Sequence, residues 1–201
     1  MLPLDTILAL VSFAFVSSIT PGPNNLMLAA SGVNFGFLRT IPHMLGVGMG
    51  FGILQLAIGF GVGGVLLTVP ELRWALKGIG AAYLLWLAWK MATARPAAKA
   101  GAGDAARPMS FIGACAFQWV NAKAWIMALG AMAVYVRADH PIVDVLTVTA
   151  VFVLVNVPCI SAWAGFGHAL GSTLADPVRL RVFNITMAVL LVASIVPMIM
   201  D

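Results

Sequence analysis

The sequence predicts an all-helical membrane protein with six transmembrane helices, arranged as two inverted repeats of three helices. Three observations support this fold class. Hydrophobic residues make up 62% of the chain and charged residues only 9%, against about 25% charged residues in an ordinary soluble domain. The apolar residues fall into six runs, with one polar linker near the chain midpoint. The first apolar run of each half carries a polar interruption.

A spanning α-helix needs about 20 consecutive apolar residues. Six runs approach or exceed this length: 6–30, 43–69, 78–94, 111–136, 143–171 and 181–200. Too few residues remain for a separate soluble domain, so residues 1–201 are expected to form a single transmembrane domain. Because the third run is short, a chain of five spans with one re-entrant segment is the alternative.

The first run, 6–30, is interrupted near its middle. The interruption is Thr20-Pro21-Gly22-Pro23-Asn24-Asn25. Neither proline can donate to a helical ladder and Gly22 permits a sharp change of direction, so two half-helices are expected. Broken backbone is tolerated at membrane depth only where it is buried in protein or lines a wet cavity. The second half-helix would direct its free N–H groups and positive dipole end at an anionic group such as a carboxylate. The alternative is a proline kink that only shapes helix packing.

The second run is rich in glycine. Pairs of glycines four residues apart allow helices to approach closely, and Gly46–Gly50 and Gly59–Gly63 form such pairs. Gly167–Gly171 repeats the spacing in the fifth run. These pairs predict a packed helix bundle and carry no functional information.

Residues 94–109 form an Ala/Gly/Pro/basic linker. The linker separates repeat one, residues 1–93, from repeat two, residues 110–201. Three spans is an odd number, so two halves with the same fold must enter the membrane in opposite directions. This inverted arrangement is typical of secondary transporters.

The fourth run opens the second half and carries its own polar cluster, about 100 residues after the first. This cluster is Gln118-Trp119-Val120-Asn121-Ala122-Lys123. Corresponding interruptions in two halves indicate a substrate site. Burying an unpaired Lys123 ammonium costs at least about 2.5 to 3.5 kcal/mol, so this side chain is expected to face an anionic partner or water. The alternative is a lysine that snorkels to the membrane interface.

The remaining polar residues in the spans give weaker signals. Asn156 and His168 are expected to be satisfied by neighbouring helices or the interface, and Cys115 and Cys159 to act as small buried hydrophobic residues. The sequence has no metal-ligand or phosphate-binding motif and no nucleophile-elbow motif, so no metal or cofactor is expected.

The basic residues predict the orientation of the chain. Seven of the 11 lysines and arginines lie on the linker side and three on the side of the termini. Those on the linker side are Arg39, Lys90, Arg95, Lys99, Arg107, Arg179 and Arg181. The positive-inside rule therefore places the linker in the cytoplasm and both termini outside it. Since the basic residues form no stripe, the net charge of +4 does not indicate nucleic-acid binding.

All seven acidic residues are expected at helix ends or in loops. A pocket without a carboxylate suits a neutral or sulfur-containing side chain better than a cationic one, although Asp5 or Asp144 could still reach inward. Proton coupling would then need another titratable group, for which Lys123 and His43 are the candidates.

The motifs together resemble the LysE/RhtB family of bacterial amino-acid exporters. Thr20 to Asn25 resembles the family's T-P-G-P-N motif, and Asn121 to Trp125 resembles its N-P-K-A motif. Lys77 to Leu87, leading to Lys90, also fits the family pattern, and the likeness extends over nearly the whole chain. The resemblance implies a compact six-helix bundle in the bacterial inner membrane, with export driven by the proton motive force.

One position departs from the family pattern. Ala122 stands where the family usually has proline. The break in the fourth run is therefore expected to be milder than the first, leaving Asn121 and Lys123 in a nearly continuous helix.

We therefore expect a secondary active exporter of a small amino acid, with protons and the lipid bilayer as its other partners. The predicted substrate-binding residues are Thr20, Pro21, Gly22, Pro23, Asn24, Asn25, Asn121 and Lys123. These residues would meet near the membrane midplane and bind the substrate carboxylate. A membrane enzyme acting on a lipid and a passive channel are the alternatives, and a homodimer is left open as an assembly.

Overall fold

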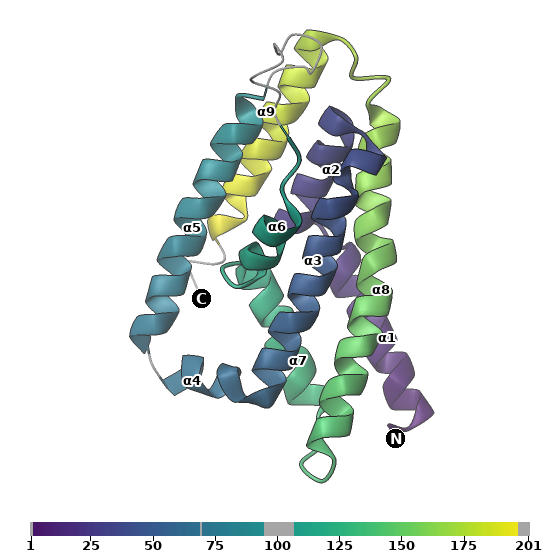
Figure 1. Ribbon diagram of the computed structural model, residues 1–201, viewed down its shortest axis with the longest axis vertical. Coiled ribbons are helices and arrows are strands. Elements are labelled where there is room, and N and C mark those ends of the chain that lie inside the picture. Colours follow the sequence, from purple (N-terminus) through teal and green to yellow (C-terminus); the bar gives the residue numbers. More distant parts are fainter. Residues whose placement is uncertain (1, 69, 95–106, 197–201) are drawn as a thin grey trace.

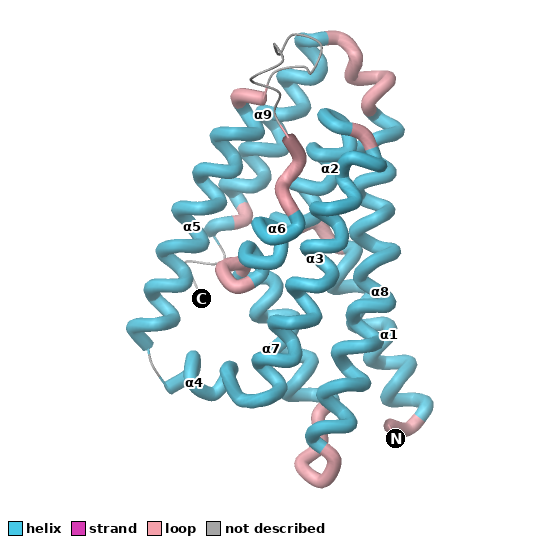
Figure 2. The backbone as a smooth tube through the Cα atoms, viewed as in Figure 1, coloured by secondary structure: helices cyan, strands magenta, loops and turns pink. Residues whose placement is uncertain are grey.

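The computed structural model describes residues 2–68, 70–94 and 107–196. Within these residues every regular element is a helix (Figures 1 and 2), as the composition predicted. In chain order the elements are α1 (Leu4–Ile19), α2 (Pro23–Phe35), α3 (Phe37–Ala57), the π-helical turn η1 (Ile58–Val62), α4 (Gly63–Thr68), α5 (Pro70–Ala92), α6 (Phe111–Gln118), α7 (Ala122–Tyr135), α8 (Pro141–Leu170) and α9 (Pro177–Ala193).

Two helical segments, Phe37–Val62 and Pro141–Leu170, are long and apolar enough to cross a membrane. Helices α1 and α2 give a third candidate if the pair, bent by 56°, counts as one span. The six-span arrangement therefore stays a prediction. Residues 95–106 of the predicted linker and the end of the last predicted span, from residue 197, lie outside the described residues.

The main helix contacts join the part of the chain before the linker to the part after it. Helix α8 runs along α1, α2 and α3, while α6 packs on α3 and α5 packs on α9 (Figure 1). Buried Phe51 of α3 and Phe152 of α8 meet edge to face, with ring centroids 5.7 Å apart, inside one of the hydrophobic clusters. The two halves are thus packed around shared cores and neither forms a separate bundle.

Glycines set the closest of these contacts. A β-carbon on Gly46 would overlap the backbone of Phe111, and one on Gly50 would lie 2.5 Å from the Cα of Cys115. Both contacts bring α3 against α6, so close helix approach at the Gly46–Gly50 pair is confirmed. Gly167 makes the same kind of contact with the backbone of Ala29, between α8 and α2.

Candidate substrate-binding site

The first predicted break lies between α1 and α2. The backbone of Thr20 and Gly22 is extended, with φ of −63° and −173°, and α2 begins at Pro23, where a missing N–H costs the helix nothing. None of the described side chains caps this end of α2. The first N–H groups of a helix have no partner within it, so this end presents free donors to its surroundings.

The second break lies between α6 and α7, and here the expectation of a nearly continuous helix was wrong. Helix α6 ends at Gln118 and α7 begins at Ala122, with Asn121 extended at φ −89° and ψ 101°. The break forms without proline because other groups satisfy the freed backbone. The indole of Trp125 donates to the carbonyl of Trp119 at 2.8 Å. Alanine in place of proline therefore does not restore the helix.

The ammonium of Lys123 joins the two breaks. Its Nζ donates to the carbonyl oxygen of Thr20 at 2.7 Å, to the Thr20 hydroxyl at 3.0 Å and to the carbonyl of Pro21 at 3.5 Å. These carbonyls lie at the C-terminal end of α1, which carries partial negative charge. In the described part of the chain the ion pairs are Arg137–Asp144 and Asp139–His140, so no carboxylate neutralises Lys123.

Amide side chains fix the geometry around the lysine. Asn25 is buried and donates to the carbonyls of Ser18 and Thr20, both at 2.8 Å, which holds the turn between α1 and α2. Asn24 donates to the Gln118 side chain at 2.8 Å and accepts from it at 3.2 Å. This reciprocal amide pair connects α2 directly to the last residue of α6.

A small polar cavity lies beside these groups, with about 30 Å³ of free volume. This is about the space of one water molecule. The hydroxyl of Ser18 and the side-chain oxygen of Asn121 are buried without a hydrogen-bond partner among the described residues. The residues that line the polar cavity are Ser17, Ser18, Gly22, Asn24, Asn25, Phe51, Asn121, Lys123, Ala124, Met127, Asn156 and Ile160.

A larger apolar cavity of about 370 Å³ also borders Lys123. Its described lining includes the broken segment and no acidic residue, and it shares Gly22, Asn121 and Lys123 with the polar cavity. The residues that line the apolar cavity are Phe13, Ser17, Thr20, Pro21, Gly22, Pro23, Leu84, Asn121, Ala122, Lys123, Ile126, Met127 and Ser194. A bound molecule there would meet one cation, a few polar groups and an apolar wall.

The structure brings all eight predicted substrate-binding residues to these two cavities. His43, the second candidate for proton coupling, lies apart from them in a third cavity. Gln118 and Asn156 belong to the site region and were not predicted to do so. The position of Gln118 within the second polar cluster could have predicted its place in the site. Asn156 is a single amide in an apolar run, and no sequence pattern links it to the site.

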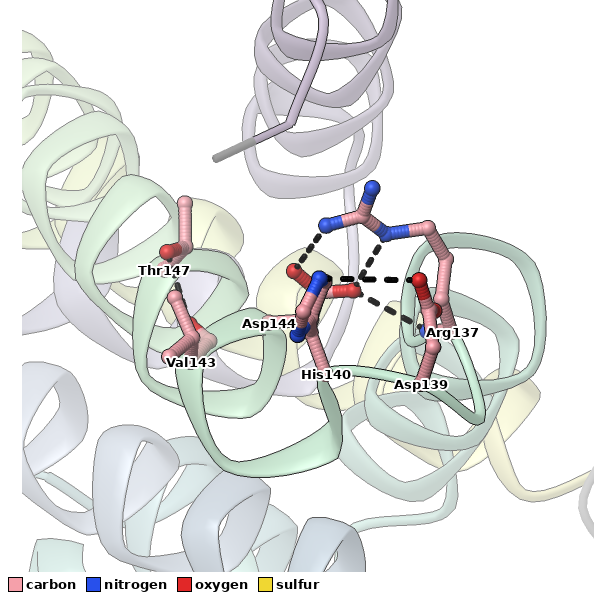
Figure 3. A network of polar contacts seen from close by, with 6 residues as sticks. All are labelled: Arg137, Asp139, His140, Val143, Asp144 and Thr147. Carbon is pink, nitrogen blue, oxygen red and sulfur yellow. Dashed lines mark hydrogen bonds and ion pairs between the residues drawn. The ribbon is translucent and has the colours of Figure 1, made fainter.

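Asp5 and Asp144, the two acidic residues that could have reached inward, line neither the polar nor the apolar cavity. Asp144 is bonded to Arg137 instead. Its buried carboxylate accepts from Arg137 Nε at 2.7 Å, Nη2 at 3.0 Å and the backbone N–H at 3.1 Å (Figure 3). The hydrogen bond to this carboxylate raises the pKa of the Arg137 guanidinium. The pair closes the connection from α7 to α8 and lines neither cavity. No cluster of potential metal ligands occurs among the described residues.

Comparison with known proteins adds independent information. The sequence model of the LysE type translocator family matches residues 15–196. The cysteine/O-acetylserine efflux protein of Escherichia coli (strain K12) is 30% identical over 183 residues, covering 90% of this chain and 91% of that protein. The protein of the same name from Salmonella typhimurium (strain LT2) is 29% identical over 182 residues, with the same coverage of each chain. No solved structure matches the chain.

Proposed function

The chain belongs to the LysE type translocator family, and we propose that it is a secondary active exporter of small amino acids with neutral or sulfur-containing side chains. The single observation that carries this proposal is Lys123, a half-buried residue that lines both cavities and whose ammonium, among the described residues, is bonded to neutral oxygens alone. A buried charge without a counter-ion is costly, and a substrate carboxylate would supply one.

The walls around Lys123 suggest how a substrate would lie. Its carboxylate would accept from Lys123 and from the free N–H groups at the start of α2. Its side chain would occupy the apolar cavity against Phe13, Leu84 and Ile126. Because the described lining offers no carboxylate, a cationic side chain would be buried unpaired there, which disfavours lysine or arginine as substrate. The named substrates of the relatives, cysteine and O-acetylserine, fit these requirements.

Substrate binding would have to compete with the contacts that Lys123 makes now. The carbonyls of Thr20 and Pro21 hold the ammonium at the C-terminal end of α1. A carboxylate carries a full negative charge and would therefore bind the ammonium more strongly than these neutral carbonyls do, drawing it away from this end. The break between α1 and α2 would then be free to move, which offers a local route to alternating access. Lys123 and His43 remain the candidates for carrying the coupled proton.

The arrangement of the helix ends supports the proposed orientation in the bacterial inner membrane. The end of α2, the end of α5 and the start of α9 lie at one end of the molecule, away from the N-terminus (Figure 1). Basic residues cluster near these three helix ends in the sequence. The positive-inside rule then places this end in the cytoplasm and both termini outside it.

Transport by the purified protein in proteoliposomes tests the proposal. Vesicles loaded with single labelled amino acids should show saturable flux that depends on an imposed proton gradient, with cysteine, serine and methionine preferred over lysine and arginine. Ungated flux without saturation would indicate a channel instead. Absence of flux for every amino acid, with turnover of the lipid, would indicate a membrane enzyme, which family membership already disfavours.

A further inference from the structure

A third cavity, here named the vestibule, has a volume of about 390 Å³ and lies between α2, α3, α5 and the segment that leads into α6. This volume falls within the range of about 300 to 1,000 Å³ that is typical of small-molecule pockets. The polar and aromatic residues of its wall include Asn34, His43, Tyr83, Trp86, Lys90 and Arg107. Unlike the polar cavity, the vestibule can hold a small amino acid without rearrangement.

Two cationic side chains line the vestibule, and no acidic residue does so among its described lining. The Nζ of Lys90 lies 4.5 Å from the ring centroid of Trp86, which stacks on Tyr83 with centroids 5.4 Å apart. A cation over an aromatic face is attracted by the ring, and the N–H donors that point away from the ring can still bind a ligand. Neither Lys90 nor Arg107 takes part in an ion pair among the described residues.

His43 supplies an independent indication of a ligand. Its side chain is only 2% exposed and lines the vestibule, yet both ring nitrogens lack a hydrogen-bond partner among the described residues. Leaving a buried polar group unsatisfied is unfavourable, because the group has lost its bonds to water and gained none in return. A bound polar molecule would remove part of this penalty if the ring turned one nitrogen toward the cavity, since one imidazole nitrogen donates and the other accepts.

The vestibule connects to the proposed substrate site through α2. Met27 lines the vestibule, and Asn24, three residues earlier on the same helix, lines the polar cavity. Asn24 is bonded to Gln118, so this amide pair joins α2 to α6 beside the polar cavity.

We propose that the vestibule is a second recognition site, at which Lys90 and Arg107 bind the carboxylate of the amino acid before it reaches Lys123. This inference rests on the proposed export function and on the orientation that places the vestibule at the cytoplasmic end. His43 borders the ligand and turns a ring nitrogen toward it on binding, and Met27, Leu87 and Met91 of the wall contact its apolar part. An exporter with this arrangement collects its substrate in an open site and transfers it to a closed one.

The test measures protection of a thiol placed at the mouth of the vestibule. Ala94→Cys, in a chain with Cys115→Ala and Cys159→Ala, is labelled with a charged maleimide in nanodiscs of phosphatidylcholine, which leave both faces accessible. L-serine and L-methionine should each slow labelling, whereas serinamide, which lacks the carboxylate, should not. Equal protection by serinamide, or no protection by either amino acid, would overturn the proposal.

Variants separate the vestibule from the deeper site. Lys90→Met should raise the amino-acid concentration that gives half-protection by about tenfold, the loss expected for one charge-assisted hydrogen bond. Lys77→Met is the matched control. Lys77 also belongs to α5, and its Nζ lies 5.2 Å from the ring centroid of Trp74, but Lys77 does not line the vestibule. Equal half-protection concentrations in these two variants would overturn the role of Lys90.

Two further measurements distinguish this proposal from its premise and from lipid binding. Lys123→Met should lose flux in proteoliposomes yet keep full protection of the thiol introduced by Ala94→Cys. Protection in a protein that transports no amino acid would refute the export function and leave the binding site standing. Protection by phosphatidylglycerol alone, without amino acid, would show that the vestibule binds a lipid headgroup and would overturn the proposal.

Discussion

The side chain of Lys123 crosses Gly22 so closely that residue 22 has no room for a β-carbon. A Cβ built there would lie 2.7 Å from Cδ of Lys123 and 3.1 Å from its Nζ. With φ at −173°, the backbone of Gly22 is extended in a way that any residue adopts. Space for the lysine, and not backbone conformation, is therefore what glycine provides at this position.

Gly22→Ala should consequently displace the Lys123 ammonium without unfolding the chain, because a lysine side chain can move aside. We expect the maximal flux of the preferred amino acid to fall at least about tenfold, as for loss of one charge-assisted interaction. Gly78→Ala is the control, since a Cβ there meets no atom within 4 Å. Equal flux in both variants would show that Gly22 does not contribute to the transport site.

Lys123→Met should abolish flux while membrane insertion and the unfolding temperature stay close to those of the unaltered chain. Methionine keeps the length of the side chain but removes the charge that would attract the carboxylate. Insertion is measured by membrane fractionation and flux in proteoliposomes. If flux through the Lys123→Met protein matches that of Lys77→Met, the central assignment of this site is wrong.

The reciprocal amide pair between Asn24 and Gln118 predicts coupled effects. Asn24→Ala leaves the side-chain oxygen of buried Gln118 without its donor, and Gln118→Ala leaves the half-buried Asn24 amide without its partner, so each should reduce flux and stability. The double variant should be less affected than the sum, with a coupling energy of about 0.5 to 1.5 kcal/mol in a double-mutant cycle on thermal unfolding. Strict additivity would mean that the two amides act independently.

The two helix breaks and their convergence could be predicted from the sequence, because the residues at each break have a distinct chemistry. Two prolines around Gly22 cannot continue a helix, and a lysine in the apolar fourth run requires a polar partner. That partner turned out to be the carbonyls of Thr20 and Pro21. The identity of the contacting atoms depends on where the two breaks meet in space, which no local pattern encodes.

Other features were inaccessible for the same reason. The break before Ala122 forms without proline, because Trp125 satisfies a carbonyl that the helix releases. The vestibule is built from α2, α3 and α5 together with residues near Arg107, so its charges are far apart in sequence. Burial of Asp144 was also missed, since a carboxylate near a helix start is usually solvated and this one meets Arg137 instead.

Gly50 should be intolerant of any side chain. A Cβ there would lie 2.5 Å from the Cα of Cys115 and 3.1 Å from Cγ of Gln118, so α3 and α6 would have to separate. Overpacking of this kind costs about 1 to 3 kcal/mol. Gly50→Ala should therefore lower the unfolding temperature in detergent, whereas Gly78→Ala should leave it unchanged or raise it slightly. Similar unfolding temperatures for the two variants would contradict the close contact.

Asp144→Asn tests whether the transport site is free of acidic groups. The Asp144 carboxylate accepts three hydrogen bonds from Arg137 and is fully buried. The side chain of Asp139 is 66% exposed, and His140 is its ion-pair partner in the described part of the chain. Replacing the Asp144 carboxylate by an amide removes the negative charge beside the Arg137 guanidinium. The amide N–H₂ is itself a donor, so it cannot accept a hydrogen bond from Arg137. Asp144→Asn should therefore lower the unfolding temperature more than Asp139→Asn does.

Because Asp144 lines neither cavity, its loss should change stability without changing substrate preference. The ratio of methionine flux to lysine flux, corrected for folded protein, should be the same in Asp144→Asn as in the unaltered chain. A shift of this ratio would place the carboxylate on the substrate path. The preference for neutral side chains would then need another cause than the absence of an acid from the site.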